Sequence, residues 1–423
     1  MKRQTQLINL AQLLLAPLPA YLLSRHILSG GQSSSPAGFS GLLKSSTTTV
    51  SSFSSLSPFQ LANLLLAFSL FLGWLASLLQ SSTWLIDPYW TLVPPLLDAF
   101  YRKACSSSSS SSSSNSKDGL FSSSSPRAAA ATLLLLLWSL RLTHSYFRRE
   151  RFRLGDREDW RYAEMRREWG RHWWWWQLVP VYAVQHFLLV GLAVPSFALR
   201  CCCSSPPSGL RLGGLSLWRF YRGGAGRSGV AAPPPSWHSL DSLAVAAALS
   251  GLALASVADS QLHAFVSSRE EQEKKRRGRA AVLESGLWSL SRHPNYLGET
   301  IFHLSLAALA VSGRYFSASS SSSASSSPPP PPPPRLLSLS VLWPLAGAAL
   351  NTACLVAVTA MTERRTATAR GRARAWEGYC SRVPCWIPRV GPVLRALTWP
   401  SGAAADAASG TKPAARPRAR RTR

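Results

Sequence analysis

The sequence predicts an all-α membrane protein: a polytopic helix bundle with about six to seven transmembrane helices. Three observations predict this class. First, 46% of the 423 residues are hydrophobic and only 15% are charged, whereas a soluble globular protein carries about 25% charged residues. Second, the apolar residues form long unbroken runs, which indicates lipid as the solvent. Third, Lys and Arg gather between these runs and in the C-terminal tail, as membrane topology signals do.

The chain divides into three parts. Residues 1–58 begin with an apolar stretch broken by Pro17 and Pro19 and continue as a Ser-rich linker. That pattern is typical of a first span or of a targeting peptide. Residues 59–392 form the predicted transmembrane domain, interrupted by a Ser-rich insertion at 105–125 and a Ser/Pro-rich insertion at 317–334. Residues 393–423 form a basic tail, which is predicted to be disordered.

Each expected span is an apolar run that ends at charged, aromatic or turn-forming residues. A run of some 20 apolar residues crosses about 30 Å of hydrocarbon. The segment Thr91–Phe100 is expected to re-enter the membrane or lie along its surface, and the stretch after Val257 is expected to be a polar connection. The predicted spans are Phe59–Leu79, Ala128–Leu142, Leu178–Leu199, Leu240–Val257, Tyr296–Val311 and Leu336–Met361.

The positive charge alternates along the chain. Segments 144–176, 259–295 and 362–423 hold 30 Lys and Arg, whereas loops 81–127, 200–235 and 314–335 hold 11. The positive-inside rule places the first group, and the C-terminus, in the cytosol. We therefore expect a multi-pass protein of the endoplasmic reticulum or another organelle membrane. The net charge of +27 belongs to this pattern, and no basic soluble module predicts a nucleic-acid partner.

The seven cysteines form neither a CxxC pair nor a zinc-finger spacing. The sequence therefore predicts no disulfide framework and no metal site. There is also no GxGxxG after a strand, no P-loop, no GxSxG and no HExxH. Any cofactor should bind among helices at the cytosolic mouth of the bundle.

The stretch from Ser285 to Glu299 carries the densest chemistry. It places Arg292, His293, Asn295, Tyr296 and Glu299 at the mouth of a span. Asn295 and Glu299 are four residues apart and share one helix face. A carboxylate at membrane depth is costly, so it usually serves a site or pairs with a cation. The alternative interpretation is a capped helix with a structural Glu–Arg pair.

Polar residues at two other span ends should face the same membrane surface. Asp259 and Gln261 end the preceding span, while Arg364 and Tyr379 follow the last one. Basic residues in that position hold phosphate groups through charge-assisted hydrogen bonds. They also occur as the basic flank that sets topology, which is the simpler interpretation for most arginines of the tail.

These stretches resemble the steroid 5α-reductase C-terminal-domain superfamily, and most closely its branch of uncharacterised 3-oxo-5α-steroid 4-dehydrogenase-like membrane proteins. The resemblance covers about residues 60–392. One departure is that Thr368 and Arg372 stand where steroid reductases have a His and a Tyr. The matching stretches are Asp87-Pro-Tyr-Trp90, Ala258-Asp-Ser-Gln261, Gly286-Leu-Trp288, Arg292-His-Pro-Asn-Tyr-Leu-Gly-Glu299, Trp376-Glu-Gly-Tyr379 and Ile387-Pro388.

The resemblance implies an enzyme that takes NADPH from the cytosolic side and reduces a carbon–carbon double bond in a small hydrophobic, lipid-like substrate such as a steroid enone. In such enzymes an acid or phenol polarises the substrate carbonyl while the hydride reaches the β-carbon. The implied catalytic residues are Glu299, Tyr296, Asp87 and Tyr89. The implied cofactor-binding residues are Asp259, Gln261, Arg292, His293, Asn295, Arg364 and Tyr379.

Two other functions remain open at this point. An S-adenosylmethionine-dependent membrane methyltransferase of the isoprenylcysteine type shares the RHPxYxG pattern, although the DPYW and ADSQ stretches favour the reductase. A non-catalytic membrane protein could use the same polar residues for helix packing alone.

Overall fold

The computed structural model describes residues 2–15, 17–22, 56–106, 125–201, 237–274, 282–320, 342–369 and 372–388. Every regular element within these ranges is helical. Most of the Ser-rich and Ser/Pro-rich insertions and the predicted tail lie outside the described residues. The predicted all-α class is confirmed.

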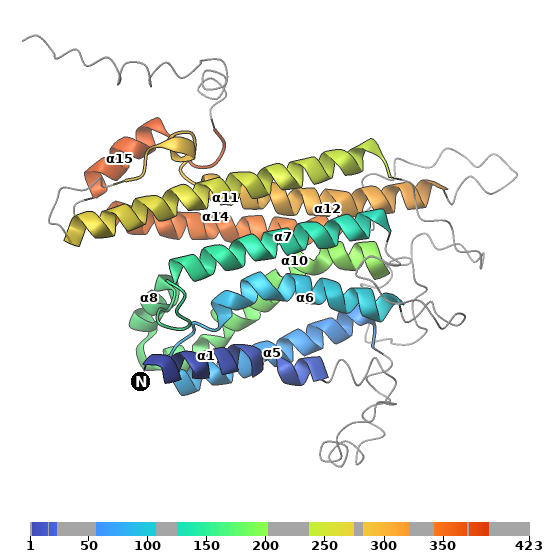
Figure 1. The fold of residues 1–423 in the computed structure, drawn as a ribbon, viewed down its shortest axis with the longest axis horizontal. Helices are drawn as coiled ribbons and strands as arrows, with labels where there is room; N and C mark the ends of the chain where they lie inside the picture. The colour runs from blue at the N-terminus through green and yellow to red at the C-terminus, as the bar shows by residue number, and fades with distance from the viewer. Residues whose placement is uncertain are drawn as a thin grey trace, which may run out of the picture.

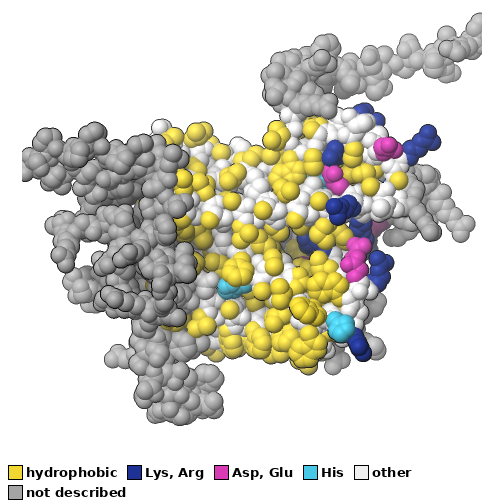
Figure 2. Space-filling model, turned by 180° about the vertical axis from the view of Figure 1, so that it is seen from behind, with side chains coloured by type: hydrophobic (Ala, Val, Ile, Leu, Met, Phe, Trp, Pro, Cys, Tyr) yellow, Lys and Arg dark blue, Asp and Glu magenta, His cyan; other side chains and the backbone are white. Residues whose placement is uncertain are grey.

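Within the described residues, seven long helices lie side by side as a bundle (Figure 1). Five of them, within 58–80, 126–149, 178–201, 239–271 and 345–368, are long and apolar enough to cross a membrane. Charged side chains gather at one end of the bundle, and apolar side chains dominate the broad middle (Figure 2). The seven helices are α5 (Pro58–Gln80), α6 (Ile86–Ser106), α7 (Pro126–Arg149), α10 (Val184–Cys201), α11 (Ser239–Lys274), α12 (Pro294–Ser320) and α14 (Leu345–Thr368).

Local sequence explains where the long helices begin. Ser57 and Gln60 form a reciprocal capping box around Pro58, the first residue of α5. The Ser125 hydroxyl caps α7 by accepting from the Ala128 N–H, with Pro126 in the first turn. Pro294 likewise opens α12, as expected for a residue whose missing N–H is harmless there.

The remaining, shorter elements lie before, between or after the long helices. The N-terminal helix α1 docks on the connection between α7 and α8, because the Gln6 and Asn9 side-chain amides donate to the Leu154 carbonyl at 2.9 and 2.7 Å. The short elements are α1 (Lys2–Leu15), α8 (Trp160–Trp169), η2 (Gly170–His172), α9 (Trp173–Trp176), η3 (Leu178–Ala183), η5 (Gly286–Ser289) and α15 (Ala373–Arg382).

Two expectations about helix extent were wrong. The segment Thr91–Phe100 neither re-enters nor lies on the surface, because it is the middle of α6, which packs against α7 and α10. The polar connection predicted after Val257 is helical as far as Lys274. At 1.5 Å per residue, the 36 residues of α11 extend about 54 Å, well beyond the hydrocarbon. Asp259 therefore lies about 30 Å from the start of α11, a distance comparable to the thickness of the hydrocarbon.

The cysteine prediction was also wrong. A disulfide joins Cys105, at the end of α6, to Cys201, at the end of α10, with the Cα atoms 5.4 Å apart. The two cysteines are separated by 96 positions in the sequence, so no local spacing pattern indicates this pairing. Both helices end away from the charged end of the bundle (Figure 1). The disulfide thus links α6 and α10 at the end of the bundle opposite the charged end.

Two buried ion pairs stabilise the same opposite end. Arg127 Nε donates to Asp241 Oδ1 at 2.9 Å and Arg127 Nη2 lies 2.7 Å from Asp241 Oδ2, and both side chains are at most 3% exposed. Arg200 contacts Asp98 at 2.9 Å, with both side chains at most 5% exposed. A charge inside a membrane protein needs such a partner. Among the residues that the structure describes, each of these pairs joins one guanidinium to one carboxylate.

Glycines allow unusually close helix contacts. A Cβ on Gly298 of α12 would lie 2.6 Å from the carbonyl oxygen of Gly251 on α11 and 2.7 Å from the backbone nitrogen of Ala255. Gly191 of α10 and Gly347 of α14 make a second such contact. Small residues at helix interfaces are typical of membrane bundles. The first contact fixes the spacing of α11 and α12 directly beside the candidate site.

Candidate functional site

A buried guanidinium lies between two carboxylates near the charged end of the bundle. Arg141 of α7 contacts Asp259 of α11 at 2.5 Å and also binds Glu299 of α12. The three side chains are 11%, 19% and 15% exposed. Three separate helices therefore meet at one ionic junction.

Two neutral side chains complete this junction. The Asn295 amide donates to the second oxygen of Asp259 at 3.1 Å, and the Trp138 indole N–H donates to the second oxygen of Glu299 at 2.8 Å. We call Trp138, Arg141, Asp259, Asn295 and Glu299 the Arg141 cluster. Each carboxylate oxygen of the cluster thus has a donor from a different direction, which fixes its orientation.

The chain order explains how these side chains meet. Asn295 and Glu299 are one helical turn apart on α12, and Gly298 lies between them. Gly251 comes two turns before Asp259 on α11. Because Gly251 and Gly298 bring the two helix backbones together, Asp259 comes within reach of Asn295.

The next turn of α12 contributes a histidine. His303 is 4% exposed and lies 3.7 Å from the Glu299 carboxylate. Its ring packs edge-on against Trp138, with the centroids 5.2 Å apart. The Trp138 and His303 rings therefore both lie next to the Glu299 carboxylate.

The Arg141 cluster is not balanced. It holds one guanidinium against two carboxylates, and two of its buried atoms have no hydrogen-bond partner within the described part of the chain: Asn295 Oδ1 and Arg141 Nε. Buried polar groups are normally paired, so unpaired ones call for an explanation. A ligand hydroxyl would donate to Asn295 Oδ1 or accept from the Arg141 Nε–H, whereas an amide N–H or a positive charge would pair with Asn295 Oδ1 and the additional carboxylate.

Arg292 and His293 belong to a different group. The Arg292 guanidinium contacts Glu363 of α14 at 2.9 Å and donates to the Val383 carbonyl at 2.8 Å. His293 Nε2 lies 3.0 Å from the same carboxylate. Burial lowers the pKa of His293 although Glu363 opposes that shift. These two predicted cofactor residues therefore connect α12, α14 and the segment after α15.

Three further predicted cofactor residues have local roles. The Gln261 side-chain oxygen accepts from the Leu287 N–H at 3.0 Å. The Tyr379 hydroxyl donates to the Trp288 carbonyl at 2.5 Å, and burial raises the pKa of this phenol. Arg364 is exposed on α14. Of the predicted cofactor residues, the structure thus places Asp259 and Asn295 in the Arg141 cluster, while Arg292 and His293 meet at Glu363.

The predicted catalytic residues are spread over three places. Glu299 lies in the Arg141 cluster, while Tyr296 stacks on His293 with the ring centroids 5.4 Å apart. Asp87 and Tyr89 lie at the start of α6. Tyr89 is 4% exposed, and its hydroxyl has no partner among the described residues. No described hydrogen bond or ion pair joins Asp87 or Tyr89 to the Arg141 cluster.

The sequence interpretation missed Arg141 and Trp138. Both lie on α7, at the end of the Leu-rich run of a predicted span. An arginine within or at the edge of an apolar run should pair with a carboxylate from a neighbouring helix. That rule would have selected Arg141, but not which carboxylate it meets.

A comparison with protein families gives one match. The model of a family described as "Protein of unknown function (DUF1295)" matches residues 73–218 and 227–320, which is more than half of the chain. The matched ranges contain the whole Arg141 cluster and end before Glu363. No curated protein and no solved structure gives a match.

Proposed function

Because the chain belongs to the DUF1295 family of proteins of unknown function, which is grouped with the steroid 5α-reductase-like proteins, we propose that it is a membrane-embedded NADPH-dependent reductase. Its substrate would be a lipid-like molecule with an activated carbon–carbon double bond, such as a steroid enone. The observation that carries this proposal is the unbalanced, partly unpaired Arg141 cluster at the charged end of an apolar bundle.

The residues of the cluster suit the hydroxyl- and amide-bearing part of a nicotinamide nucleotide. NADPH supplies a hydride when bound. The Asp259 and Glu299 carboxylates would accept hydrogen bonds from hydroxyl and amide donors, and the unpaired Asn295 Oδ1 offers a further acceptor. Arg141 holds both carboxylates in place. Such orientation in a water-poor site strengthens each of these interactions.

A phenol would polarise the substrate carbonyl. Tyr89 is the better candidate, because its hydroxyl is buried and unpaired within the described part of the chain. Tyr296 is the second, since it lies one residue from Asn295 but stacks on His293. A positioned O–H donor stabilises the negative charge that develops on the carbonyl oxygen during reduction.

The same proposal includes an orientation. The Lys- and Arg-rich segments would face the cytosol, where NADPH is available, and the opposite end would face the lumen. The Cys105–Cys201 disulfide lies at that opposite end. Disulfides persist in oxidising compartments, which supports a membrane of the secretory pathway such as the endoplasmic reticulum.

A binding titration tests the reductase proposal. The full chain, purified in detergent, is titrated separately with NADPH, NADH and S-adenosylmethionine, and tryptophan fluorescence is followed because Trp138 lies in the cluster. We expect saturable binding of NADPH that weakens at least tenfold in Asn295→Ala and Glu299→Gln. Glu284→Gln is the matched control, because it removes a carboxylate from an exposed ion pair with Arg382.

One structural observation favours a second candidate. A cluster with more carboxylates than guanidinium groups also suits the positively charged sulfonium of S-adenosylmethionine. Saturable binding of that compound without NADPH binding would replace the reductase with a methyltransferase. Binding of neither compound by the folded protein would favour a non-catalytic membrane protein, in which the cluster only stabilises helix packing.

A further inference from the structure

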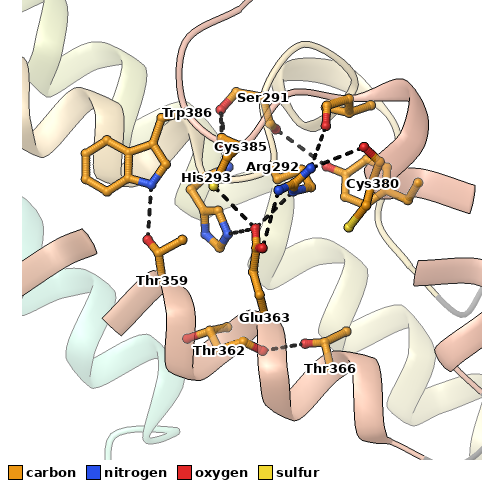
Figure 3. A network of polar contacts seen from close by, with 12 residues as sticks. Ser291, Arg292, His293, Thr359, Thr362, Glu363, Thr366, Cys380, Cys385 and Trp386 are labelled. Carbon is orange, nitrogen blue, oxygen red and sulfur yellow. Dashed lines mark hydrogen bonds and ion pairs between the residues drawn. The ribbon is translucent and has the colours of Figure 1, made fainter. Parts of the chain in front are cut away.

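Three side chains that differ in chemistry converge beside the start of α12. They are His293, just before that helix, Glu363 in the last turns of α14, and Cys385 in the segment after α15 (Figure 3). Their ligand atoms all lie within 4.8 Å of one another. We call these three residues the His–Glu–Cys group. It lies outside the Arg141 cluster.

The spacing suits a metal ion. His293 Nε2 lies 3.0 Å and Cys385 Sγ 3.4 Å from Glu363 Oε1. Zinc binds imidazole nitrogen and carboxylate oxygen at about 2.0–2.2 Å and thiolate sulfur at about 2.3 Å in tetrahedral geometry, which separates neighbouring ligand atoms by roughly 3.4 Å. Two of the three pairs of ligand atoms thus stand at about the distances that one coordinated cation imposes, and all three pairs lie within 4.8 Å.

The backbone holds the ligands in this arrangement. The N–H of Arg292 donates to the Pro384 carbonyl at 3.0 Å, and the N–H of His293 donates to the Cys385 carbonyl at 3.1 Å. Two neighbouring hydrogen bonds therefore fix the histidine segment against the cysteine segment. A site prepared in this way loses little conformational freedom when it binds a ligand.

Arg292 supports the carboxylate from the outer side. Its Nε contacts Glu363 Oε1 at 2.9 Å, its Nη2 contacts Oε2 at 3.3 Å, and its Nη1 donates to the Val383 and Cys380 carbonyls. When a cation takes Oε1, the guanidinium keeps Oε2 and both carbonyls. Hydrogen bonds of this kind orient metal-binding carboxylates.

From this geometry we propose that His293, Glu363 and Cys385 bind a divalent cation of the zinc class, with one coordination position left for water. Binding would release the thiol proton of Cys385 to solvent, and the proton on His293 Nε2 would move to Nδ1. The cation would connect α12, α14 and the segment after α15. This site needs neither NADPH nor the reductase activity.

Cobalt tests the site because it replaces zinc and absorbs light when thiolate binds it. The full chain, reduced, freed of metal with a chelator and kept in detergent, is titrated with Co²⁺. We expect one equivalent to produce a sulfur-to-cobalt charge-transfer band that Zn²⁺ abolishes. The band should be lost in Cys385→Ser and kept in Cys354→Ser, which removes a free cysteine of α14 outside the group. Absence of the band from the folded wild type would overturn the proposal. A band that is lost in Cys380→Ser but kept in Cys385→Ser would also overturn it.

A second measurement needs no variant. Cys385 and Cys354 of the metal-free wild type are alkylated with and without Zn²⁺, and each modified peptide is quantified by mass spectrometry. We expect Zn²⁺ to slow alkylation of Cys385 at least tenfold, to leave Cys354 unchanged, and to lose its effect when a chelator is added. Equal alkylation rates of Cys385 with and without Zn²⁺ would exclude the site, whatever the outcome of the NADPH titration.

Discussion

Replacing Gly298 with Ala should separate the two helices that carry the candidate site. The new Cβ would lie 2.6 Å from the Gly251 carbonyl oxygen, while ordinary contact begins at 3.4 Å. The backbones must therefore move apart by about 0.8 Å. Because rigid backbone atoms form the obstacle, we expect an overpacking cost of about 2–3 kcal/mol. The better helix propensity of Ala offsets about 1 kcal/mol of it.

The same movement should weaken ligand binding. The hydrogen bond of 3.1 Å between Asn295 and Asp259 joins the two helices, and a shift of that size stretches it beyond hydrogen-bonding distance. We therefore expect Gly298→Ala to lower both the thermal stability and the NADPH affinity of the purified protein.

Gly378→Ala is the matched control for this experiment. Its Cβ would meet only the flexible end of Arg382 at 3.5 Å, so the helix propensity of Ala should act alone. Thermal unfolding in detergent, followed by circular dichroism, should place the Gly298→Ala midpoint on the order of 5 °C below that of Gly378→Ala. Equal midpoints would refute the close contact between α11 and α12.

Three further variants probe single interactions, each followed by thermal unfolding in detergent. Trp138→Phe removes the indole donor to Glu299 and should cost about 1.5–3 kcal/mol; an unchanged midpoint would contradict the bond. Asp241→Asn leaves the guanidinium of its buried ion pair uncompensated and should cost about 3–5 kcal/mol, and a loss below 1 kcal/mol would show that the site is hydrated. Burial opposes ionisation of Asp159, but hydrogen bonds from its neighbour Arg161 lower its pKa below the usual 3.8. The ionised Asp159 carboxylate therefore contributes its full stabilisation of the folded state above about pH 3.8, and this stabilisation is lost as the pH falls through the lowered pKa. The thermal stability of Asp159→Asn should accordingly depend less on pH below about pH 4 than that of the wild type.

The sequence predicted the fold where the signal is local. Apolar runs indicated the spans, and five of the long helices are apolar enough to cross a membrane. Hydropathy failed for α6, because Asp87, Pro94 and Pro95 interrupt its apolar character. Such residues are tolerated where neighbouring helices cover them, and that packing is not visible in one helix. The Cys105–Cys201 pairing was missed for the same reason.

The candidate site was predicted only in part. Asn295 and Glu299 share a helix face, so their proximity follows from the sequence. Their contact with Asp259 and Arg141 depends on how α7, α11 and α12 pack, which the Gly251–Gly298 contact decides. Tyr379 was expected in the same site, yet its hydroxyl binds the Trp288 carbonyl instead. The contacts that were predicted depend on neighbours in one helix, whereas those that were missed depend on how separate helices pack, which no local sequence pattern encodes.

The buried ion pairs at the opposite end offer an internal reference for judging the Arg141 cluster. Within the described residues, Arg127 and Asp241 pair one guanidinium with one carboxylate through two bonds, as a structural pair requires. The Arg141 cluster instead has an additional carboxylate, which raises the cost of burial unless a ligand compensates it. Functional sites commonly sacrifice stability in this way.

This comparison leads to a prediction for Glu299→Gln, which removes the additional negative charge and keeps the shape of the side chain. If the cluster serves a ligand, the variant should unfold at the same temperature as the wild type or a higher one, while its NADPH affinity falls at least tenfold. A purely structural cluster should respond as Asp241→Asn does, with a large loss of stability and no change in binding per folded molecule. Thermal unfolding and the NADPH titration, measured on the same preparation, separate the two results. The charge imbalance around Arg141 has a functional meaning only if stability and affinity change independently.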